Sequence, residues 1–266
     1  MTSSDLRTRR DGPATFAGCY RVYRPRSTAP LRLVCYPHAG GSASFYQRWV
    51  SCLPDWVELV IARYPGREDR LGDQQFASLQ LLADELAEAL APAVDRPTAI
   101  FGHSMGAAVA YEVTRRLERR GLEPTRLIVS GRPAPHRQRP RRIHLRDDDG
   151  LIAEVVGLSP ESAARFDDEA LRQLVLPTIR ADYRLIETYR PDAPGRVRTP
   201  IAAVVNGDDQ EVNQDEADAW RECTAGDFEL RQLPGGHFHL VDSAEEFTRW
   251  LETALRPDPH SWPSTP

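Results

Sequence analysis

A serine between two glycines is the residue of this sequence best suited to covalent chemistry. Gly102-His103-Ser104-Met105-Gly106 directly follows a short apolar run and opens a helical pattern. This is the Gly-x-Ser-x-Gly arrangement of a nucleophile elbow, in which a sharp strand-to-helix turn exposes the serine hydroxyl. A Cβ atom at Gly102 or Gly106 would collide with the neighbouring strand and helix. The motif therefore predicts Ser104 as a nucleophile in a strained turn.

A serine hydroxyl needs a base within hydrogen-bond reach and a third group that orients this base. In a fold with such an elbow the acid follows the serine in the chain, and the histidine comes last. His237 and His239 satisfy this order, because both come just after the last predicted strand. Gly235 and Gly236 let this loop reach back toward the elbow, which favours His237 over His239 as the base.

The acid is expected in the loop that follows the predicted strand Ile201–Val205. This loop reads Asn206-Gly207-Asp208-Asp209-Gln210-Glu211 and offers three carboxylates. We favour Asp209, with Asp208 as the second candidate. A charged turn is the alternative interpretation for the carboxylates that do not act.

Two backbone N–H groups are expected to stabilise the oxyanion that forms when the serine attacks a carbonyl. One follows the nucleophile and the other comes from the loop after the first core strand. Met105 would supply the first. The second would come from Ala39, within Pro37-His38-Ala39-Gly40-Gly41-Ser42, where paired glycines let the backbone approach a substrate. The glycine pair could instead form a plain turn.

The elements that must position these residues follow an α/β pattern. Short, nearly continuous apolar runs alternate with helical periods, as expected for a parallel sheet buried on both faces and joined by right-handed crossovers. Ser78 is placed to cap one helix, and Gly121 to end another. The predicted strands are Cys19–Tyr23, Leu31–Tyr36, Val57–Ala62, Thr98–Phe101, Arg126–Ser130, Ile201–Val205 and Phe228–Leu233; the predicted helices of this part are Leu79–Leu90, Ala107–Arg120, Ala217–Cys223 and Ala244–Leu255.

One segment interrupts this alternation. Residues 136–191, here named the helical insertion, contain no predicted strand, only the helical segments Leu151–Val156, Ala170–Leu176 and Ile179–Tyr189. Because ligands bind at strand ends in such folds, we interpret the insertion as a lid over the active site, with a packing subdomain as the alternative. The predicted organisation is an N-terminal tail at 1–18, an α/β domain with the helical insertion at 19–255 and a Pro-rich tail at 256–266.

Composition restricts the remaining possibilities. The chain has 266 residues and a net charge of −5, which argues against a nucleic-acid partner. All 34 basic residues are Arg, so a Lys nucleophile is excluded. The N-terminus lacks the apolar stretch of a secretory signal, and no apolar run is long enough to span a membrane. The four cysteines lack metal-ligand spacing and are typical of free thiols in a reducing cytoplasm.

The sequence resembles the type II thioesterases, which are stand-alone α/β-hydrolases that accompany polyketide and nonribosomal peptide synthases. The resemblance extends from about Leu31 to Leu255. It is carried by Tyr36–Tyr46, Tyr64-Pro65-Gly66-Arg67, Gly102–Gly106, Ser130–Pro135, Leu176-Pro177 with Arg180–Tyr183, and Gly235-Gly236-His237-Phe238.

The resemblance implies a Ser–Asp–His hydrolase that removes aberrant or stalled acyl groups from the phosphopantetheine of acyl or peptidyl carrier proteins. It implies no metal or cofactor of the protein's own, because the phosphopantetheine belongs to the carrier. We also expect a monomer. The family's acid loop often reads Gly-Asp-x-Asp-Pro, whereas Gln210 stands three residues after Gly207 here. Counting back from Trp220, which the family shares, places Asp209 at the acid position.

Two alternative functions use the same residues. A general carboxylesterase or lipase would carry the same triad, and a product-releasing thioesterase domain would act on a related substrate. A last feature concerns the partner: Arg132, Arg137, Arg139, Arg141 and Arg142 lie within a stretch that contains no acid. We interpret this arginine run either as a surface that steers an acidic carrier toward the pocket mouth or as a solvated loop.

Overall fold

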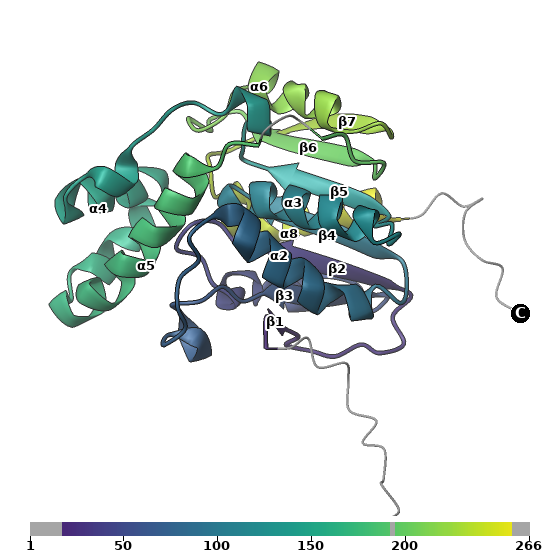
Figure 1. Ribbon diagram of the computed structural model, residues 1–266, viewed down its shortest axis with the longest axis horizontal. Helices are drawn as coiled ribbons and strands as arrows, with labels where there is room; N and C mark the ends of the chain where they lie inside the picture. The colour runs from purple at the N-terminus through teal and green to yellow at the C-terminus, as the bar shows by residue number, and fades with distance from the viewer. Residues whose placement is uncertain (1–17, 192–194, 257–266) are drawn as a thin grey trace, which may run out of the picture.

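The computed structural model describes residues 18–191 and 195–256, which build a seven-stranded sheet covered by helices (Figure 1). The strand order is β1-β3-β2-β4-β5-β6-β7; β1 pairs antiparallel with β3, and all other pairs are parallel. The strands are β1 (Tyr20–Arg21), β2 (Leu31–Tyr36), β3 (Val57–Ala62), β4 (Thr98–His103), β5 (Arg126–Ser130), β6 (Ile201–Asn206) and β7 (Phe228–Leu233). The predicted mostly parallel α/β sheet is confirmed.

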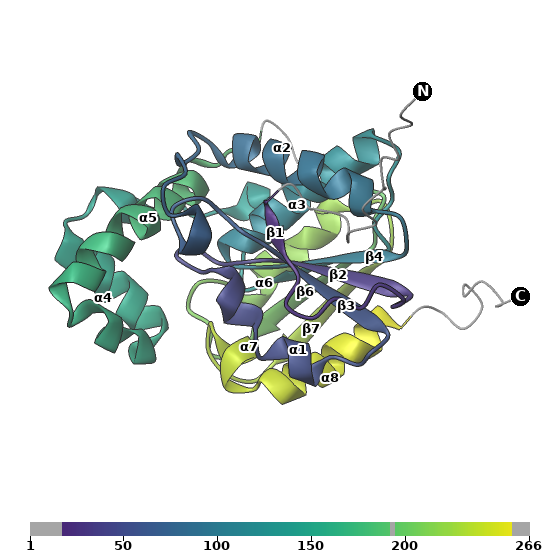
Figure 2. The same cartoon turned by 90° about the horizontal axis from the view of Figure 1, so that it is seen from below.

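Alternate residues of the central strands feed two cores, one on each face of the sheet. Val34 and Ile100 pack on the face covered by α2 (Leu79–Leu90) and α3 (Met105–Arg119). Leu33 and Phe101 pack on the opposite face with residues of α1 (Trp49–Cys52) and α8 (Ala244–Leu255). Figure 2 shows these two layers on either side of the strands. Burial on both faces explains why the strands are apolar without alternation.

The helix boundaries follow local chemistry. The Ser78 hydroxyl accepts a hydrogen bond from the Leu81 N–H and so begins α2 as predicted. Gly121 adopts a φ of 75° just beyond α3, which also matches the prediction. The predicted helix Ala217–Cys223 is wrong in its bounds: α6 (Gln214–Asp218) begins earlier and continues as a 3₁₀ helix, Ala219–Cys223. Asn213 and Glu216 form a capping box that starts α6 at this earlier point.

The helical insertion forms a separate group of helices beside one end of the sheet (Figure 1). Its described residues include no strand, as predicted, and its main elements are α4 (Asp148–Leu158), a 3₁₀ helix (Pro160–Phe166) and α5 (Glu169–Thr188). The prediction of two helices separated near Pro177 is wrong, because α5 runs through this proline. Leu176 and Ile179 are buried on either side of Pro177, so packing holds the helix together where the proline removes one backbone hydrogen bond.

The predicted tails, 1–18 and 256–266, lie outside the described residues apart from Gly18 and Arg256. Across the described ranges, no helix is long and apolar enough to cross a membrane.

Candidate active site

Ser104 occupies the tight turn between β4 and α3. Its φ of 54° is positive, and its backbone N–H donates a hydrogen bond to the Ser130 carbonyl oxygen at 2.8 Å. A Cβ atom on Gly102 would lie 2.1 Å from the Gly106 carbonyl oxygen, and one on Gly106 would lie 2.0 Å from that of Tyr36. The steric reason given above for the two glycines is therefore confirmed. The strained backbone places the residue at the carboxyl end of the sheet, where α3 begins.

His237 and Asp209 form a buried, hydrogen-bonded couple. The Nδ1 atom of His237 lies 2.9 Å from Oδ2 and 3.0 Å from Oδ1 of Asp209, and the two side chains are 3% and 0% exposed. The Glu211 N–H also donates a hydrogen bond to Asp209 Oδ1, at 2.9 Å. Asp208 is exposed, and its backbone N–H binds the Gly235 carbonyl oxygen. The structure thus brings Asp209, and not Asp208, to the imidazole.

The acid loop and the histidine loop are tied together at their bases. The Asn206 side-chain amide donates a hydrogen bond to the Gly236 carbonyl oxygen at 2.9 Å, and the Gly207 N–H binds the Leu233 carbonyl oxygen. These bonds fix the position of His237 relative to the end of β6. Among the described residues no hydrogen bond joins the Ser104 hydroxyl to His237. Such bonds are often long in a free enzyme and tighten when substrate binds.

His239, the second candidate for the base, lies elsewhere. It is 2% exposed, begins α7 (His239–Asp242), and packs its ring against Phe247 with the ring centroids 5.5 Å apart. Burial lowers the pKa of its imidazole. No contact brings it to Ser104 or Asp209 within the described ranges.

The two predicted oxyanion donors are both free. In the part of the chain that the structure describes, neither the Ala39 N–H nor the Met105 N–H donates a hydrogen bond. Met105 is the first residue of α3, where backbone N–H groups lack helical partners. Ala39 lies in a turn closed by a hydrogen bond from the Gly41 N–H to the His38 carbonyl oxygen at 2.9 Å. The glycine pair therefore does form a turn, and this turn leaves one N–H unpaired.

Two histidines that precede Ser104 in the chain also lie in the site. The ring centroids of His103 and His237 are 4.7 Å apart, and those of His38 and His103 are 6.2 Å apart. Burial lowers the pKa of His38 to about 3, and burial also moves the pKa of His103 well below its usual range; the neighbouring His237 acts in the same direction in both cases. Both rings are thus neutral near pH 7. The chain order that predicts His237 as the base does not predict that His38 and His103 lie beside it.

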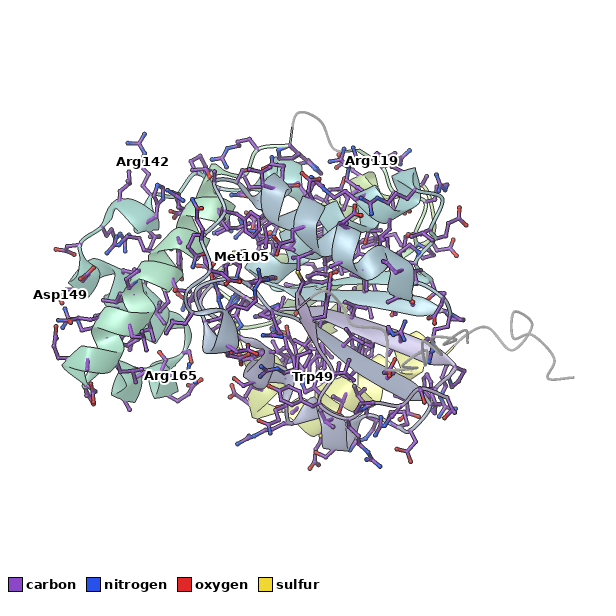
Figure 3. The ribbon with its side chains drawn as sticks, turned by 60° about the horizontal axis from the view of Figure 1, so that its bottom comes forward. Trp49, Met105, Arg119, Arg142, Asp149 and Arg165 are labelled. Atoms are coloured by element: carbon purple, nitrogen blue, oxygen red, sulfur yellow. The ribbon has the colours of Figure 1, made fainter. Side chains whose placement is uncertain are left out.

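A cavity of about 220 Å³ connects the site loops with the helical insertion. Figure 3 shows Met105 near the place where the sheet meets the insertion, on which Arg165 lies. The walls come from the Ala39 loop, the residue after His237, α4, α5 and the 3₁₀ helix between them. The lining residues are His38, Ala39, Gly40, Phe45, Val155, Leu158, Ser159, Glu161, Ser162, Arg165, Phe166, Val175, Ile179, Tyr183, Phe238 and Val241.

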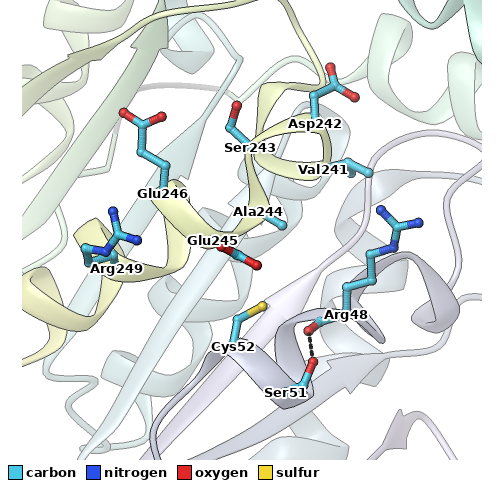
Figure 4. A pocket seen from close by; sticks show the side chains of 10 residues that line it. All are labelled: Arg48, Ser51, Cys52, Val241, Asp242, Ser243, Ala244, Glu245, Glu246 and Arg249. Carbon is cyan, nitrogen blue, oxygen red and sulfur yellow. Dashed lines mark hydrogen bonds between the residues drawn. The ribbon is translucent and has the colours of Figure 1, made fainter.

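A larger hollow of about 550 Å³ lies between α1 and the α7–α8 segment (Figure 4). Arg48 and Arg249 line it together with Asp242, Glu245 and Glu246, so its charges are mixed. It contains none of the predicted site residues. Its size alone gives it no role in the chemistry at Ser104.

None of the five arginines of the run lines the cavity of about 220 Å³. Arg132, Arg139 and Arg141 instead line a separate hollow of about 350 Å³ together with Gln210 and Glu211 of the acid loop. Arg139 binds Glu216 at 2.6 Å, and Arg141 binds both Glu211, at 2.5 Å, and Glu154. The acids come from distant parts of the chain, which the local sequence could not reveal. Their carboxylates neutralise much of the positive charge that the run carries.

Possible metal ligands do not cluster in the described ranges: no group of three or more His, Cys, Asp or Glu side chains could hold a metal ion there.

Comparisons with known proteins agree with this geometry. A family model described as the thioesterase domain matches residues 31–255. The chain is 42% identical over 255 residues to the probable cadicidin biosynthesis thioesterase of Streptomyces griseus, covering 94% of this chain and 71% of that protein. It is 40% identical over 228 residues to the thioesterase PikA5 of Streptomyces venezuelae, covering 85% of this chain and 81% of the relative.

Solved structures give the same result. The type II thioesterase BorB from the borrelidin biosynthetic cluster superimposes with a TM-score of 0.84 at 39% identity, covering 92% of this chain and all of BorB. YbtT, a type II thioesterase from the yersiniabactin pathway, superimposes with a TM-score of 0.81 at 34% identity, covering 91% of this chain and 98% of YbtT. A second YbtT structure carries a serine-to-alanine substitution.

Proposed function

The chain belongs to the thioesterase family, and on this basis we propose that Ser104, His237 and Asp209 hydrolyse acyl thioesters carried on the phosphopantetheine of a carrier protein. The observation that carries the proposal is the buried His237–Asp209 pair at the elbow that holds Ser104. Such a pair gives the imidazole the tautomer and the charge stabilisation that a serine nucleophile requires. In this proposal the enzyme is an editing thioesterase of a polyketide or nonribosomal peptide pathway.

The chemistry divides into two transfers of the acyl group. His237 Nε2 takes the proton of the Ser104 hydroxyl as its oxygen attacks the thioester carbonyl, while Asp209 accepts the Nδ1–H bond. The N–H groups of Ala39 and Met105 bind the resulting oxyanion. The C–S bond breaks, and His237 returns the proton to the leaving thiol. Water deprotonated by His237 then attacks the acyl-serine, and the carboxylic acid leaves as Ser104 regains its proton.

The cavity supports an acyl group as the part of the substrate that lies beneath the insertion. Nine of its lining side chains are aliphatic or aromatic hydrocarbons from the insertion, the site loops and α7: Ala39, Phe45, Val155, Leu158, Phe166, Val175, Ile179, Phe238 and Val241. In this proposal the insertion is a lid that keeps water from the acyl-enzyme until hydrolysis. The phosphopantetheine arm comes with the carrier, and the mechanism requires no metal or cofactor of the protein's own.

Hydrolysis of a panel of acyl carrier proteins, followed by intact mass spectrometry, tests this function. We expect kcat/KM for acyl carriers to exceed that for matched p-nitrophenyl esters, since those esters lack the carrier and its arm. The reverse ranking would instead indicate a general carboxylesterase.

The nucleophile is tested in the same preparation. A fluorophosphonate probe should label one serine of the native protein, and Ser104→Ala should abolish both labelling and turnover while the protein stays folded. Labelling that persists in Ser104→Ala would refute the assignment of the nucleophile.

A further inference from the structure

A buried ion pair joins the helical insertion to the loop after β3, and both of its side chains also contact the loop that carries Ala39. Arg67 and Asp182 are separated by 115 residues, and the Arg67 guanidinium contacts both carboxylate oxygens of Asp182, at 2.7 and 2.8 Å. The two side chains are 9% and 2% exposed. Two parallel hydrogen bonds of this kind give defined geometry as well as energy. Asp182 lies in the second half of α5, and Arg67 lies in the loop that follows β3.

The same two side chains also hold the backbone next to Ala39. Asp182 Oδ2 accepts a hydrogen bond from the Gly40 N–H at 2.8 Å, and Arg67 donates one to the Gly41 carbonyl oxygen, also at 2.8 Å. Arg67 further donates to the Pro65 carbonyl oxygen, at 3.2 Å. The ion pair thus ends on the two residues that directly follow Ala39 in the turn.

Packing along α5 strengthens this connection. The Thr178 hydroxyl donates a hydrogen bond to the Gly66 carbonyl oxygen at 2.7 Å. Gly40 has a φ of 75°, and a Cβ atom there would lie 2.9 Å from Cγ1 of Ile179. Three residues of α5 therefore lie directly against the Ala39 turn or the Arg67 loop. This part of the helix thus contacts the turn through both packing and hydrogen bonds.

We propose that Arg67 and Asp182 are positioning residues that aim the Ala39 N–H at the oxyanion, so that the site is competent only while α5 is docked. The inference rests on the proposed function, because it presumes that Ser104 attacks a carbonyl carbon. Neither side chain needs to touch substrate. Both fix the peptide that follows the donor, and a donor to an oxyanion acts only if its N–H is held at the position where the charge develops.

A comparison of two buried carboxylates on α5 tests this role. Asp182→Asn keeps the side-chain shape but removes the charge that holds Arg67. Glu187→Gln is the matched control: Glu187 is also buried and accepts hydrogen bonds from the N–H groups of Ile143 and His144, away from the Ala39 turn. Both substitutions weaken charge-assisted hydrogen bonds of the insertion, but only Asp182→Asn alters a contact with the Ala39 turn.

The expected result is a loss in kcat with little change in KM. A misplacement of about 1 Å at a reacting group costs about 10²-fold, and removal of one oxyanion donor costs about 10²- to 10³-fold. We expect Asp182→Asn to lower kcat on a small acyl thioester about 10²-fold, and Glu187→Gln to leave it nearly unchanged. An alkyl trifluoromethyl ketone, whose adduct with serine carries an oxyanion, should lose affinity for Asp182→Asn by a similar factor. The carboxylic acid product, which makes no such adduct, should bind equally well to both variants.

A double variant tests whether the loss of kcat in Asp182→Asn comes only from unfolding around an unpaired buried charge. Replacing both charged partners of a buried pair by apolar residues is often neutral for stability. Arg67→Met/Asp182→Leu should therefore retain a cooperative thermal transition yet show the same loss in kcat and in inhibitor affinity. The single variant Arg67→Lys keeps a positive charge beside Asp182. It should therefore retain part of the kcat that the double variant loses.

Three outcomes would overturn the inference. These are unchanged kcat in Asp182→Asn, a rise in KM alone, and equal losses in Asp182→Asn and Glu187→Gln. The rate of fluorophosphonate labelling at Ser104 separates this failure from failure of the proposed function. Labelling needs the oxyanion donors but no thioester, so slower labelling in Asp182→Asn supports the positioning role even if carrier thioesters prove not to be the substrate.

Discussion

At the scale of single residues, Asp208 and Asp209 are chain neighbours in different surroundings. The Asp209 carboxylate is buried and lies within 3.0 Å of His237 Nδ1, whereas Asp208 faces solvent. A carboxylate next to the imidazole fixes its tautomer and stabilises its positive charge. We propose these roles for Asp209, and substituting each aspartate in turn shows which of the two acts on the imidazole.

Asp209→Asn should reduce hydrolysis by several orders of magnitude. The loss for the equivalent change in a serine protease is about 10⁴-fold in kcat, because the amide favours the wrong tautomer. Asp208→Asn, the matched control at the adjacent position, should have a mild effect. Steady-state kinetics on one acyl thioester measures both, and a large loss confined to Asp208→Asn would make Asp208 the acid.

Residue types and chain order led to Ser104, His237 and the pair of acidic candidates, but not to Asp182. The elbow and the loop glycines are local patterns, and each imposes a conformation that its neighbours in sequence reveal. The Arg67–Asp182 pair joins residues 115 positions apart. With 34 basic and 39 acidic side chains in the chain, charge alone offers too many pairings to select this one.

At the scale of elements, the elbow is a junction between a strand and a helix in which backbone atoms leave no room for a Cβ atom on either glycine. Gly106→Ala would place a Cβ atom 2.0 Å from the Tyr36 carbonyl oxygen, which belongs to the backbone of β2. We expect a loss of about 1–3 kcal/mol or more in the free energy of unfolding, the usual cost of forcing a methyl group into a packed site. Urea denaturation measures this loss.

Gly157→Ala is the matched control for that substitution. A Cβ atom at Gly157, in α4, meets no atom within 4 Å. An alanine in a helix is favoured over glycine by roughly 0.5–1 kcal/mol, so the control should be neutral or stabilising. If both variants unfold at the same urea concentration as the wild type, the elbow is less constrained than its contacts indicate.

The strands that are buried on both faces could be predicted, because such strands need apolar residues at nearly every position. Leu31–Tyr36, Val57–Ala62 and Arg126–Ser130 match the observed strands at both ends. Phe228–Leu233 also matches, although β7 lies at the edge of the sheet and is largely exposed. Elements without a period were not predictable: α1 has only four residues and one fully buried side chain, Trp49. The single helix α5 was also missed, because a proline ordinarily marks a helix end and only tertiary packing overrides it here.

At the scale of the whole molecule, buried neutral histidines link stability to pH. The pKa of His38 in the folded protein is about 3 and that of His103 is well below its usual range, both mainly through burial. An unfolded chain regains the ordinary value of about 6.5. Below pH 6.5 the unfolded state therefore binds protons that the folded state does not, and stability falls as pH falls.

We therefore expect the free energy of unfolding to decrease between pH 6.5 and pH 5. Each histidine that stays neutral in the folded state contributes a slope of roughly 1 kcal/mol per pH unit. Urea titrations at several pH values measure the slope, and His38→Phe should flatten it because one titrating group is removed. A stability that stays constant over this range would contradict the neutral state of both rings.

The net charge of the surface at the arginine run could not be predicted from the local sequence. Its own stretch contains no acid, yet Glu154, Glu211 and Glu216 reach it from α4, the acid loop and α6. Charge patterning along the sequence predicts which surfaces are polar. Whether a surface is electrically positive depends on which acids fold against it.

The course of α5 through Pro177 also has a mechanical consequence. The part after Pro177 is anchored by Thr178 and Asp182, whereas the part before it supplies Val175 to the cavity wall. A proline removes a hydrogen bond of the helix, so bending stiffness is lowest at this point. The eight residues from Glu169 to Leu176 form a lever about 12 Å long, at about 1.5 Å per residue, and a rotation of about 10° at this fulcrum moves its tip about 2 Å. We therefore expect a rotation at Pro177 to displace Glu169 far more than Val175, which lies two residues from the fulcrum and would move only about 0.5 Å at about 1.5 Å per residue. Ile179 and Tyr183, on the anchored side, hold their part of the cavity wall next to the Ala39 turn.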